Sequence, residues 1–424
     1  MPQEYCLTGA RLIDPLLSRD EIGDLAIRDG KIVAPDTLSA GAIRLDLHGK
    51  VVAPGFLDLH VHLREPGQTH KEDIVTATRA AAAGGFTTVL AMPNTAPPID
   101  SPEAFRELNR RLPGRAVIEV LQSVALTIGR KGEHVTDIKA LKAAGVTALT
   151  DDGSTPQDET VMREAMLLAK ENNLPVIDHC EDLSLSKPGV MHAGKISQKL
   201  ALPGQPRLAE ERIVERDIRL CRETGCRIHL QHLSSAGSVE MLRQARKEGL
   251  PVTGEVTPHH LFLTDQAIEQ YGTNAKMAPP LREEKDRQML IEALCDGTIS
   301  AIATDHAPHA PDEKAQNMLQ APFGIIGLEA AVPLSLTLLY HQRLISLPHL
   351  IARFSSGPRA VLGLPPATLN PGSTASLTIL DPDHEYILDT AKFHSKSLNC
   401  PYQGIPCIGK ISGVFFQGQY LPAN

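Results

Sequence analysis

The sequence of 424 residues has no tryptophan, few aromatic residues and no surplus of basic residues. Because its formal net charge is -8, we do not expect nucleic acid as a partner. No apolar run approaches the roughly 18 residues of a membrane span, and the first residues lack a charged-then-apolar signal pattern. We therefore expect a cytoplasmic protein with no membrane partner.

Two further absences narrow the range of possible fold classes. The seven cysteines show no paired spacing, which argues against a disulfide framework. Cys180 follows His179, but no other cysteine offers it a partner for a thiolate metal site, so we interpret Cys180 as a packing residue. No glycine-rich turn with the dinucleotide-binding fingerprint follows the first buried strand of the middle region, which argues against a dinucleotide-binding sheet.

The middle of the chain alternates predicted strands and helices. Strands are expected at 57–63, 86–93, 116–126, 146–152, 175–181, 226–234, 251–257 and 299–309. Helices are expected between them at 72–85, 102–112, 159–173, 211–225, 239–249 and 284–297, several of them closed by glycine. Eight strands that alternate with helices predict an α/β fold of the (β/α)8 barrel type.

Both ends of the chain read as short strands with tight turns. Asp29-Gly30, between two alternating apolar segments, is a strong hairpin signal. We expect residues 1–54 and 366–424 to form one small β-sandwich domain, and residues 55–365 to form the barrel domain.

The segment FLDLHVHLREP at 56–66 places two histidines and an arginine on one alternation of a strand. His60, His62 and Arg64 would project to the same face, and two neutral imidazoles form half of a metal site. A single histidine pair is moderate evidence, but histidine or aspartate recurs at the ends of other predicted strands, at His179, His232 and Asp305 among others. In a barrel these ends meet on one face.

Such a set of ligands exceeds what one tetrahedral zinc ion needs, and it suits two divalent ions roughly 3.5–4 Å apart. We expect one ion on His60, His62 and Asp305 and the other on His179 and His232. A residue of the fourth strand must bridge them.

A series of motifs resembles the cyclic amidohydrolases, and within them the class I dihydroorotases. The motifs run through the chain in order: HVHLREPG at 60–67, GGFTTVLAMPNT at 84–95, LTDDG at 149–153, HCED at 179–182, QHLS at 231–234, EVTPHHLFLT at 255–264, KMAPPLR at 276–282, IATDHAPH at 302–309 and APFGIIGLE at 321–329. The resemblance implies a zinc enzyme, with two ions per subunit, that reversibly cyclises N-carbamoyl-L-aspartate to L-dihydroorotate in pyrimidine synthesis. The chemistry agrees, because a metal-bridging hydroxide can attack the cyclic amide while Asp305 acts as general base and acid.

The bridging position separates branches of this superfamily. Hydantoinases and some dihydroorotases use a carboxylated lysine on the fourth strand, but AAGVTALTDDG has no lysine there. Asp152 matches the family position and is assigned as the bridge. Asp151 would point to the opposite face of a regular strand, although a bulge at the strand end would leave the choice between the two open.

The expected substrate carries a carboxylate, which needs cationic and amide partners. Arg64 can bind it bidentately, with Asn94 and His309 as further donors. The family motif also places His62, Phe323 and Gly324 beside the substrate. One departure is Ala278, where the family usually has an asparagine that contacts substrate, so one contact there is in doubt. The competing interpretation of Arg64 is a surface ion pair with Glu65.

Several other histidines are interpreted as structural residues outside the metal site. His259 and His260 are expected to anchor loops, His229 to face the packing between barrel and helices, and His306 to face away from the metal site. The polar segment at 311–322 is interpreted as a mobile lid over the substrate, against the alternative of an ordinary surface loop.

Two other functions stay open. One is a hydantoinase or dihydropyrimidinase activity, against which stand the missing lysine and the presence of Arg64 and Asn94. The other is a metal-free scaffold for aspartate transcarbamoylase, which would be expected to lose the metal ligands that this chain keeps. A homodimer is a family-level expectation, and association with aspartate transcarbamoylase is left open.

Overall fold

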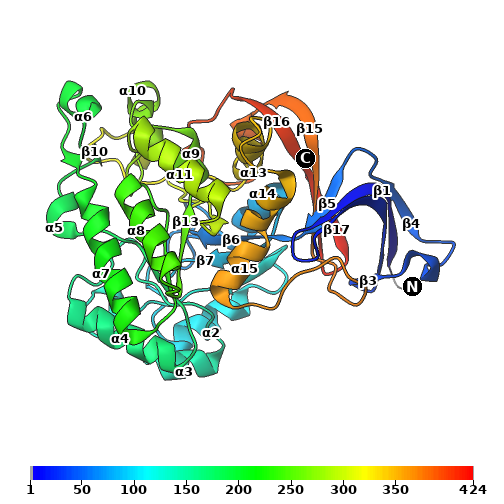
Figure 1. The fold of residues 1–424 in the computed structure, drawn as a ribbon, viewed down its shortest axis with the longest axis horizontal. Coiled ribbons are helices and arrows are strands. Elements are labelled where there is room, and N and C mark those ends of the chain that lie inside the picture. Colours follow the sequence, from blue (N-terminus) through cyan, green and yellow to red (C-terminus); the bar gives the residue numbers. More distant parts are fainter. Residues whose placement is uncertain (1–2, 424) are drawn as a thin grey trace.

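The computed structural model describes residues 3–423, which form a lobe rich in helices and a lobe of strands (Figure 1). The α/β class predicted from the sequence is confirmed, since parallel strands alternate with helices over the middle of the chain. None of the helices in the described residues combines the length and the apolar character that crossing a membrane requires.

Strands from both ends of the chain lie in one eight-stranded sheet. Its order is β17-β16-β15-β5-β1-β2-β3, with β4 paired to β1. The strands are β1 (Glu4–Asp14), β2 (Arg19–Arg28), β3 (Lys31–Val33), β4 (Ile43–Asp46), β5 (Val51–Pro54), β15 (Leu377–Ile387), β16 (Pro406–Phe416) and β17 (Gln419–Pro422). The antiparallel pairing of β5 with β15 joins the two chain ends, which share an apolar core.

The hairpin predicted at Asp29-Gly30 is confirmed. These two residues connect the antiparallel strands β2 and β3, and both have positive φ, at 51° and 71°. A two-residue turn with positive φ at both positions matches the twist of the flanking strands, and asparagine, aspartate and glycine adopt that backbone conformation most readily.

The middle of the chain contains a second set of strands, all paired in parallel. They are β6 (Phe56–Val61), β7 (Phe86–Ala91), β8 (Glu119–Gln122), β9 (Val176–Asp178), β12 (Ile228–Leu230), β13 (Val252–Val256) and β14 (Ala301–Ile302). Two sheets, β6-β7-β8 and β9-β12-β13-β14, are joined by isolated parallel bridges through Leu149 and through Val61 and His306. The pairings therefore lead from β6 around the set and back to β6.

The prediction of a regular strand over 146–152 is wrong. In the described residues Leu149 forms only isolated bridges, to Val124 and Val176. Beyond Leu149, backbone amides donate to side-chain oxygens in place of the hydrogen bonds between strands. The Asp152 amide donates to Thr150 Oγ1, and the Thr127 amide donates to Asp151 Oδ1. These local bonds compete with regular strand pairing and shape a turn at the strand end.

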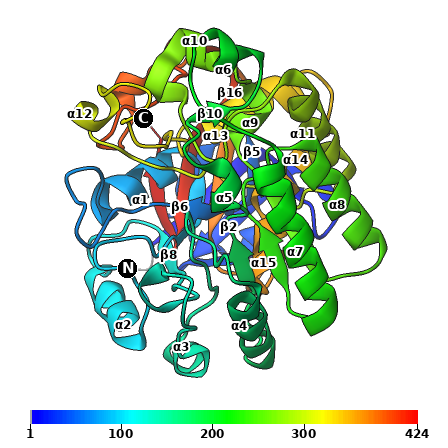
Figure 2. The same ribbon diagram turned by 90° about the vertical axis from the view of Figure 1, so that its left-hand side faces the viewer.

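The six predicted helices are present as α1 (Ile74–Ala83), α2 (Pro102–Arg111), α4 (Glu159–Glu171), α7 (Leu208–Thr224), α8 (Ala236–Lys247) and α11 (Glu284–Asp296). Figure 2 shows α2, α4, α7 and α8 on the outside, with β6 and β8 nearer the middle. Gly225 and Gly297 end α7 and α11 in the left-handed conformation, as the sequence predicted for glycine stop signals.

Shorter elements fill the connections. They are the helices α3 (Ile138–Ala144), α5 (Leu183–Ser186), α6 (Lys195–Lys199), α9 (Pro258–Phe262), α10 (Ala267–Tyr271), α12 (Pro311–Lys314), α13 (Ala331–Ser335), α14 (Leu347–Phe354) and α15 (Ser356–Leu362), and the strands β10 (Met191–His192) and β11 (Gly204–Gln205). Strand β6 is buried along its whole length, with Phe56 stacked on Phe354 of α14. The backbone that bears the His60 side chain is therefore buried and held by packing.

Candidate active site

A pocket of about 180 Å³ opens just past the carboxyl ends of the parallel strands. It gathers residues that follow β6, β7, β9, β12 and β14, together with the turn after Leu149 and the loop after His309. The residues that line it are His62, Arg64, Asn94, Asp152, Gly153, His179, His232, Ala278, Asp305, Ala307, His309, Phe323 and Gly324. The structure thus brings together nearly all of the site residues expected from the sequence.

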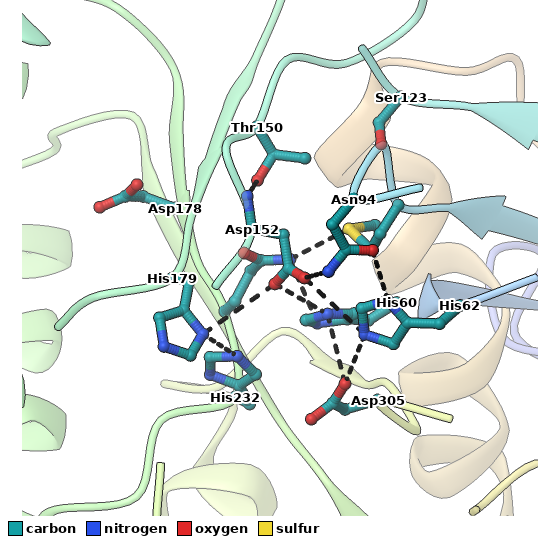
Figure 3. A network of polar contacts seen from close by, with 12 residues as sticks. His60, His62, Asn94, Ser123, Thr150, Asp152, Asp178, His179, His232 and Asp305 are labelled. Carbon is teal, nitrogen blue, oxygen red and sulfur yellow. Dashed lines mark hydrogen bonds and ion pairs between the residues drawn. The ribbon is translucent and has the colours of Figure 1, made fainter. Parts of the chain in front are cut away.

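His60 and His62 present their Nε2 atoms to two carboxylates (Figure 3). His60 Nε2 lies 3.1 Å from Asp152 Oδ1 and 3.5 Å from Asp305 Oδ1. His62 Nε2 lies 3.0 Å from Asp305 Oδ1 and 3.7 Å from Asp152 Oδ2. Two imidazoles and two carboxylates therefore converge on one small volume, with His60 fully buried beneath the pocket.

Asp58 fixes the first strand against the last. Its buried carboxylate accepts from the His60 amide at 3.0 Å, from the Thr304 amide at 3.0 Å and from Thr304 Oγ1 at 2.6 Å. Burial raises the pKa of Asp58 to about 7 against the lowering effect of these bonds. The bonds hold His60 beside the residue that precedes Asp305.

His179 and His232 form the other side of the cluster. His179 Nδ1 lies 2.8 Å from His232 Nε2 and 4.0 Å from Asp152 Oδ1, so Asp152 faces both histidine pairs. His232 and Asp305 have positive φ values of 27° and 46°. For residues other than glycine this backbone is strained, and such strain concentrates at functional sites.

The two neighbouring aspartates face different surroundings. Asp152 points into the pocket, where Asn94 Nδ2 donates to its Oδ2 at 2.9 Å. Asp151 accepts hydrogen bonds from the amide and the hydroxyl of Thr127. The alternation of side chains at the strand end thus holds despite the irregular pairing, and Asp152 has the geometry for a bridge between the two histidine pairs.

The electrostatics of the cluster favour a cation. Burial alone would raise the pKa of Asp152 and of Asp305, but the surrounding histidines outweigh it and hold both pKa values well below the usual range. Burial would lower the pKa of His60, yet Asp152 and Asp305 raise it well above its ordinary value. For His232, burial and the neighbouring histidines lower the pKa to about 3.

The residues fit a divalent metal centre. His60 Nε2 is buried and has no hydrogen-bond partner of acceptable geometry in residues 3–423, although two carboxylates lie near it. Two groups of potential ligands overlap at His60: one with His62 and Asp305, the other with Asp152 and His232. Imidazole nitrogens and carboxylate oxygens are ligands that zinc accepts.

Arg64 lies in the wall of the pocket with its side chain buried. Its Nε donates to the Pro308 carbonyl at 3.0 Å, and its Nη2 lies 3.4 Å from His309 Nε2. The competing interpretation of an ion pair with Glu65 is wrong, since Glu65 pairs with Arg115 at 2.7 Å. Burial lowers the pKa of Arg64 to about 10, so it stays cationic at neutral pH and lacks a close carboxylate within the described chain.

Asn94 is engaged by the histidine and carboxylate cluster. His62 Nδ1 lies 2.9 Å from Asn94 Oδ1, and Asn94 Nδ2 donates to Asp152. This amide was expected to contact substrate, whereas here it orients His62 and Asp152. Its substrate contact stays a prediction.

Sequence reasoning missed two glutamates that hold histidines from behind. Glu255 Oε1 lies 3.1 Å from His60 Nδ1, and Glu181 Oε2 lies 3.1 Å from His179 Nε2. Burial would raise their pKa values, but the histidine partners lower both to about 2. Both glutamates lie in the motif strings EVTPHHLFLT and HCED, although nothing in their spacing marks the contact.

Other histidines lie outside the cluster. His260 Nε2 contacts the Pro279 carbonyl at 3.0 Å and His259 Nδ1 contacts the Tyr402 hydroxyl at 2.7 Å, so both anchor loops. His306 faces Glu72 and the Gly327 amide, away from the pocket. The expectation for His229 is wrong, because it points to Glu255 behind His60 rather than to the helix layer.

The segment at 311–322 is tied to the wall of the pocket by two buried lysines. Lys314 Nζ donates to the Pro322 and Gly324 carbonyls, both at 3.0 Å, and Lys276 Nζ donates to the Met318 and Ala321 carbonyls at 2.7 and 2.5 Å. These bonds fix the approach to Phe323 and Gly324, which argues for a fixed wall over a mobile lid.

Replacing Lys314 with methionine is expected to change how stability depends on pH. Burial lowers the pKa of Lys314 to about 7, below its value in the unfolded chain. Its contribution is therefore fully present above the unfolded pKa and is lost as pH falls through about 7. Urea unfolding should show the stability of the wild type rising relative to Lys314→Met between pH 7 and pH 10, by up to about 1.4 kcal/mol per pH unit.

The same comparison with Lys392→Met, a change at an exposed side chain, is the control. A difference between wild type and Lys314→Met that stays constant over this pH range would contradict the burial of an ammonium group at this point.

Comparisons with known proteins agree with this geometry. A family model described as dihydro-orotase-like matches residues 49–238. A curated dihydroorotase of Caldanaerobacter subterraneus subsp. tengcongensis is 45% identical over 402 residues, which cover 94% of this chain and 93% of that protein. A curated dihydroorotase of Bacillus cytotoxicus is 45% identical over 388 residues, which cover 91% of each.

Solved structures share the fold. The L-hydantoinase (dihydropyrimidinase) from Arthrobacter aurescens has a TM-score of 0.89 at 25% identity and covers 100% of this chain and 96% of that chain. A dihydropyrimidinase from Brevibacillus agri has a TM-score of 0.87 at 22% identity, with 100% of this chain and 95% of that chain covered.

Proposed function

The chain belongs to the dihydroorotase family, and we propose that it reversibly cyclises N-carbamoyl-L-aspartate to L-dihydroorotate with release of water. The main observation in favour of this substrate is the state of Arg64. Its guanidinium is buried in the pocket wall and has no close carboxylate in the described chain. A guanidinium in that state matches a substrate carboxylate, which it can bind through two parallel hydrogen bonds.

The architecture that supports this function is a (β/α)8 barrel with its active site at the carboxyl ends of the strands. Support comes from the parallel pairings that lead from β6 around the set and back to it. We assign residues 55–365 to the barrel domain, and residues 1–54 and 366–424 to a small β-sandwich domain; of these, residues 1–2 and 424 lie outside the described part of the chain. The shared core of the two chain ends supports the second assignment.

The histidine and aspartate cluster would hold two zinc ions. His60, His62 and Asp305 would hold one, His179 and His232 the other, and Asp152 would bridge them. When bound, the ions supply a water made acidic enough to attack near neutral pH, and they polarise the scissile carbonyl. Two observations support this assignment: His60 Nε2 has no hydrogen-bond partner of acceptable geometry in the described residues, and the two ligand groups overlap at His60.

Asp305 moves the proton in the hydrolytic direction. Its carboxylate accepts the proton of the attacking water as the new C–O bond forms at the ring carbonyl carbon. When the ring C–N bond breaks, Asp305 returns that proton to the departing nitrogen. In cyclisation the carboxyl group that closes the ring first takes up a proton from solvent. Asp305 then takes a proton from the ureido nitrogen and gives it to the hydroxyl of that carboxyl group, which leaves as water.

Pocket residues orient the substrate for this transfer. Arg64 binds the carboxylate. His309, the second expected donor, lies beside the guanidinium with its Nε2 2.7 Å from the Phe323 carbonyl, a contact that it would exchange for the substrate. Phe323 and Gly324 line the pocket, and their backbone would lie beside the substrate. Ala278 offers only a methyl group, so substrate binding relies more heavily on Arg64 and His309.

Neither rival function is favoured. A hydantoinase activity would leave Arg64 without a carboxylate to bind, and the curated relatives that match most of the chain are dihydroorotases. A metal-free scaffold would have no need for six converging histidine and aspartate side chains.

The test of this function is turnover of L-dihydroorotate, followed by absorbance, together with zinc analysis of the reconstituted protein. We expect hydrolysis of the ring amide and two zinc ions per chain. Less than one zinc per chain after careful reconstitution, with no turnover, would remove the proposal and favour the scaffold.

A further inference from the structure

Glu255 lies near the carboxyl end of β13, is fully buried and does not itself line the pocket. We propose that Glu255 is a positioning residue that holds one histidine from each side of the metal cluster in its ligand geometry. This inference rests on the proposed metal centre, because it concerns the side chains that would bind the ions.

One oxygen of Glu255 contacts both sides of the cluster. Oε1 lies 3.1 Å from His60 Nδ1, and it accepts a hydrogen bond from the His232 amide at 3.3 Å. His60 belongs to the proposed first zinc site and His232 to the second. Among the carboxylates described above that support a histidine from behind, Glu255 therefore reaches two proposed ligands, whereas Glu181 reaches His179.

The other oxygen is anchored in turn. Oε2 lies 3.0 Å from His229 Nε2, and His229 Nδ1 lies 2.8 Å from Thr253 Oγ1. Glu255 and Thr253 are both on β13, so this chain of contacts ties the carboxylate back to its own strand. A buried carboxylate is stable only when donors surround it, and these contacts supply them.

The contact with His60 selects one form of its imidazole. A carboxylate only accepts hydrogen bonds, so the proton of neutral His60 must lie on Nδ1. Nε2 is then an acceptor with its lone pair directed at Asp152 and Asp305, as a metal ligand requires. Gln231 is compatible with this when its amide oxygen, which is otherwise buried without a partner, faces Nδ1.

The contact with His232 acts through the backbone. His232 has a φ of 27°, which is costly for a residue other than glycine. The hydrogen bond from its amide to Glu255 holds this conformation and keeps His232 Nε2 beside His179 Nδ1. Without Glu255, the His60 proton would no longer be held on Nδ1, and the strained backbone of His232 would no longer be fixed.

The test compares Glu255→Gln with Glu210→Gln. Glu210 is a matched control because it is also buried and accepts two backbone amides, from Ser234 and Ser235, but contacts no proposed ligand. Zinc affinity is measured by competition with a chromophoric chelator. We expect Glu255→Gln to lower it by roughly 10–100-fold and Glu210→Gln to leave it unchanged.

A second readout needs no metal. Nitrogen-15 NMR of histidine-labelled, metal-free protein, recorded at alkaline pH above the raised pKa of His60 so that its imidazole is neutral, reports which nitrogen carries the proton, because protonated and unprotonated nitrogens differ in shift. We expect the wild type to carry the His60 proton on Nδ1 and Glu255→Gln to transfer part of it to Nε2, because the new amide can donate to Nδ1. Glu255→Asp, which keeps the charge but shortens the reach, serves if the glutamine variant does not fold.

The two readouts separate the inference from the function it rests on. A wild type that binds no zinc but shows the Nδ1 proton lost in Glu255→Gln would contradict the metal centre and keep the positioning role. Unchanged zinc affinity together with an unchanged His60 tautomer in a folded Glu255 variant would overturn the inference.

Discussion

Asp305→Asn is expected to lower kcat for dihydroorotate hydrolysis by roughly 10²–10⁴-fold, the usual contribution of a general acid–base group. The amide keeps the shape of the carboxylate and its contact with His62, but it cannot take a proton from water. The fold should persist, because Asp58 and Thr304 fix the end of β14 independently of the Asp305 side chain. Absorbance assays at saturating substrate measure the effect.

Asp265→Asn is the matched control, because Asp265 is buried but does not line the pocket. Zinc content is measured on the same samples, since Asp305 would also bind an ion. If Asp305→Asn turned over dihydroorotate at a rate near that of the wild type, its role in proton transfer would be ruled out.

Arg64→Met is expected to lower kcat/KM for dihydroorotate by about 100-fold or more. Hydrogen bonds to charged groups contribute about 1.5–3 kcal/mol each, and a guanidinium can offer two to the substrate carboxylate. Methionine fills much of the same apolar space without the charge. Dihydrouracil, the same ring without the carboxylate, has nothing to lose, so its turnover should change far less.

The ratio of kcat/KM for the two substrates is the decisive quantity, because it cancels any general damage to the pocket. Arg115→Met is the control: it removes an arginine that pairs with Glu65, the neighbour of Arg64, on the outside of the site. An unchanged ratio in Arg64→Met would show that Arg64 does not bind the carboxylate, and it would revive the hydantoinase alternative.

Local patterns were sufficient to predict much of the fold. The six long helices follow from amphipathic runs with glycine stops, and Gly225 and Gly297 show why: only glycine adopts the left-handed conformation there without strain. The Asp29-Gly30 hairpin follows from the same local physics. In contrast, residues 146–152 do not form the predicted regular strand, because hydrogen bonds of Asp151 with Thr127 and of Asp152 with Thr150 replace strand pairing. The contact with Thr127 depends on the tertiary fold, so the local sequence could not predict it.

The site shows a similar division. Side-chain alternation is a local property, so it gave the direction of His60 and His62 and the opposite directions of Asp151 and Asp152. Glu255 was missed because its partners, His60, His229 and His232, come from other strands. A glutamate in a strand gives no signal of its own, and only the assembled sheet brings it behind the ligands. The hydrogen bonds of Asn94 with His62 and Asp152 were missed for the same reason, because these partners also come from other segments of the chain.

The most direct test of the account is a crystal structure of the zinc-reconstituted protein with N-carbamoyl-L-aspartate, using anomalous scattering to locate the metal. The account predicts one zinc on His60, His62 and Asp305, a second on His179 and His232, Asp152 between them, and a substrate carboxylate on Arg64. Metal bound away from these side chains, or a substrate carboxylate far from Arg64, would contradict it.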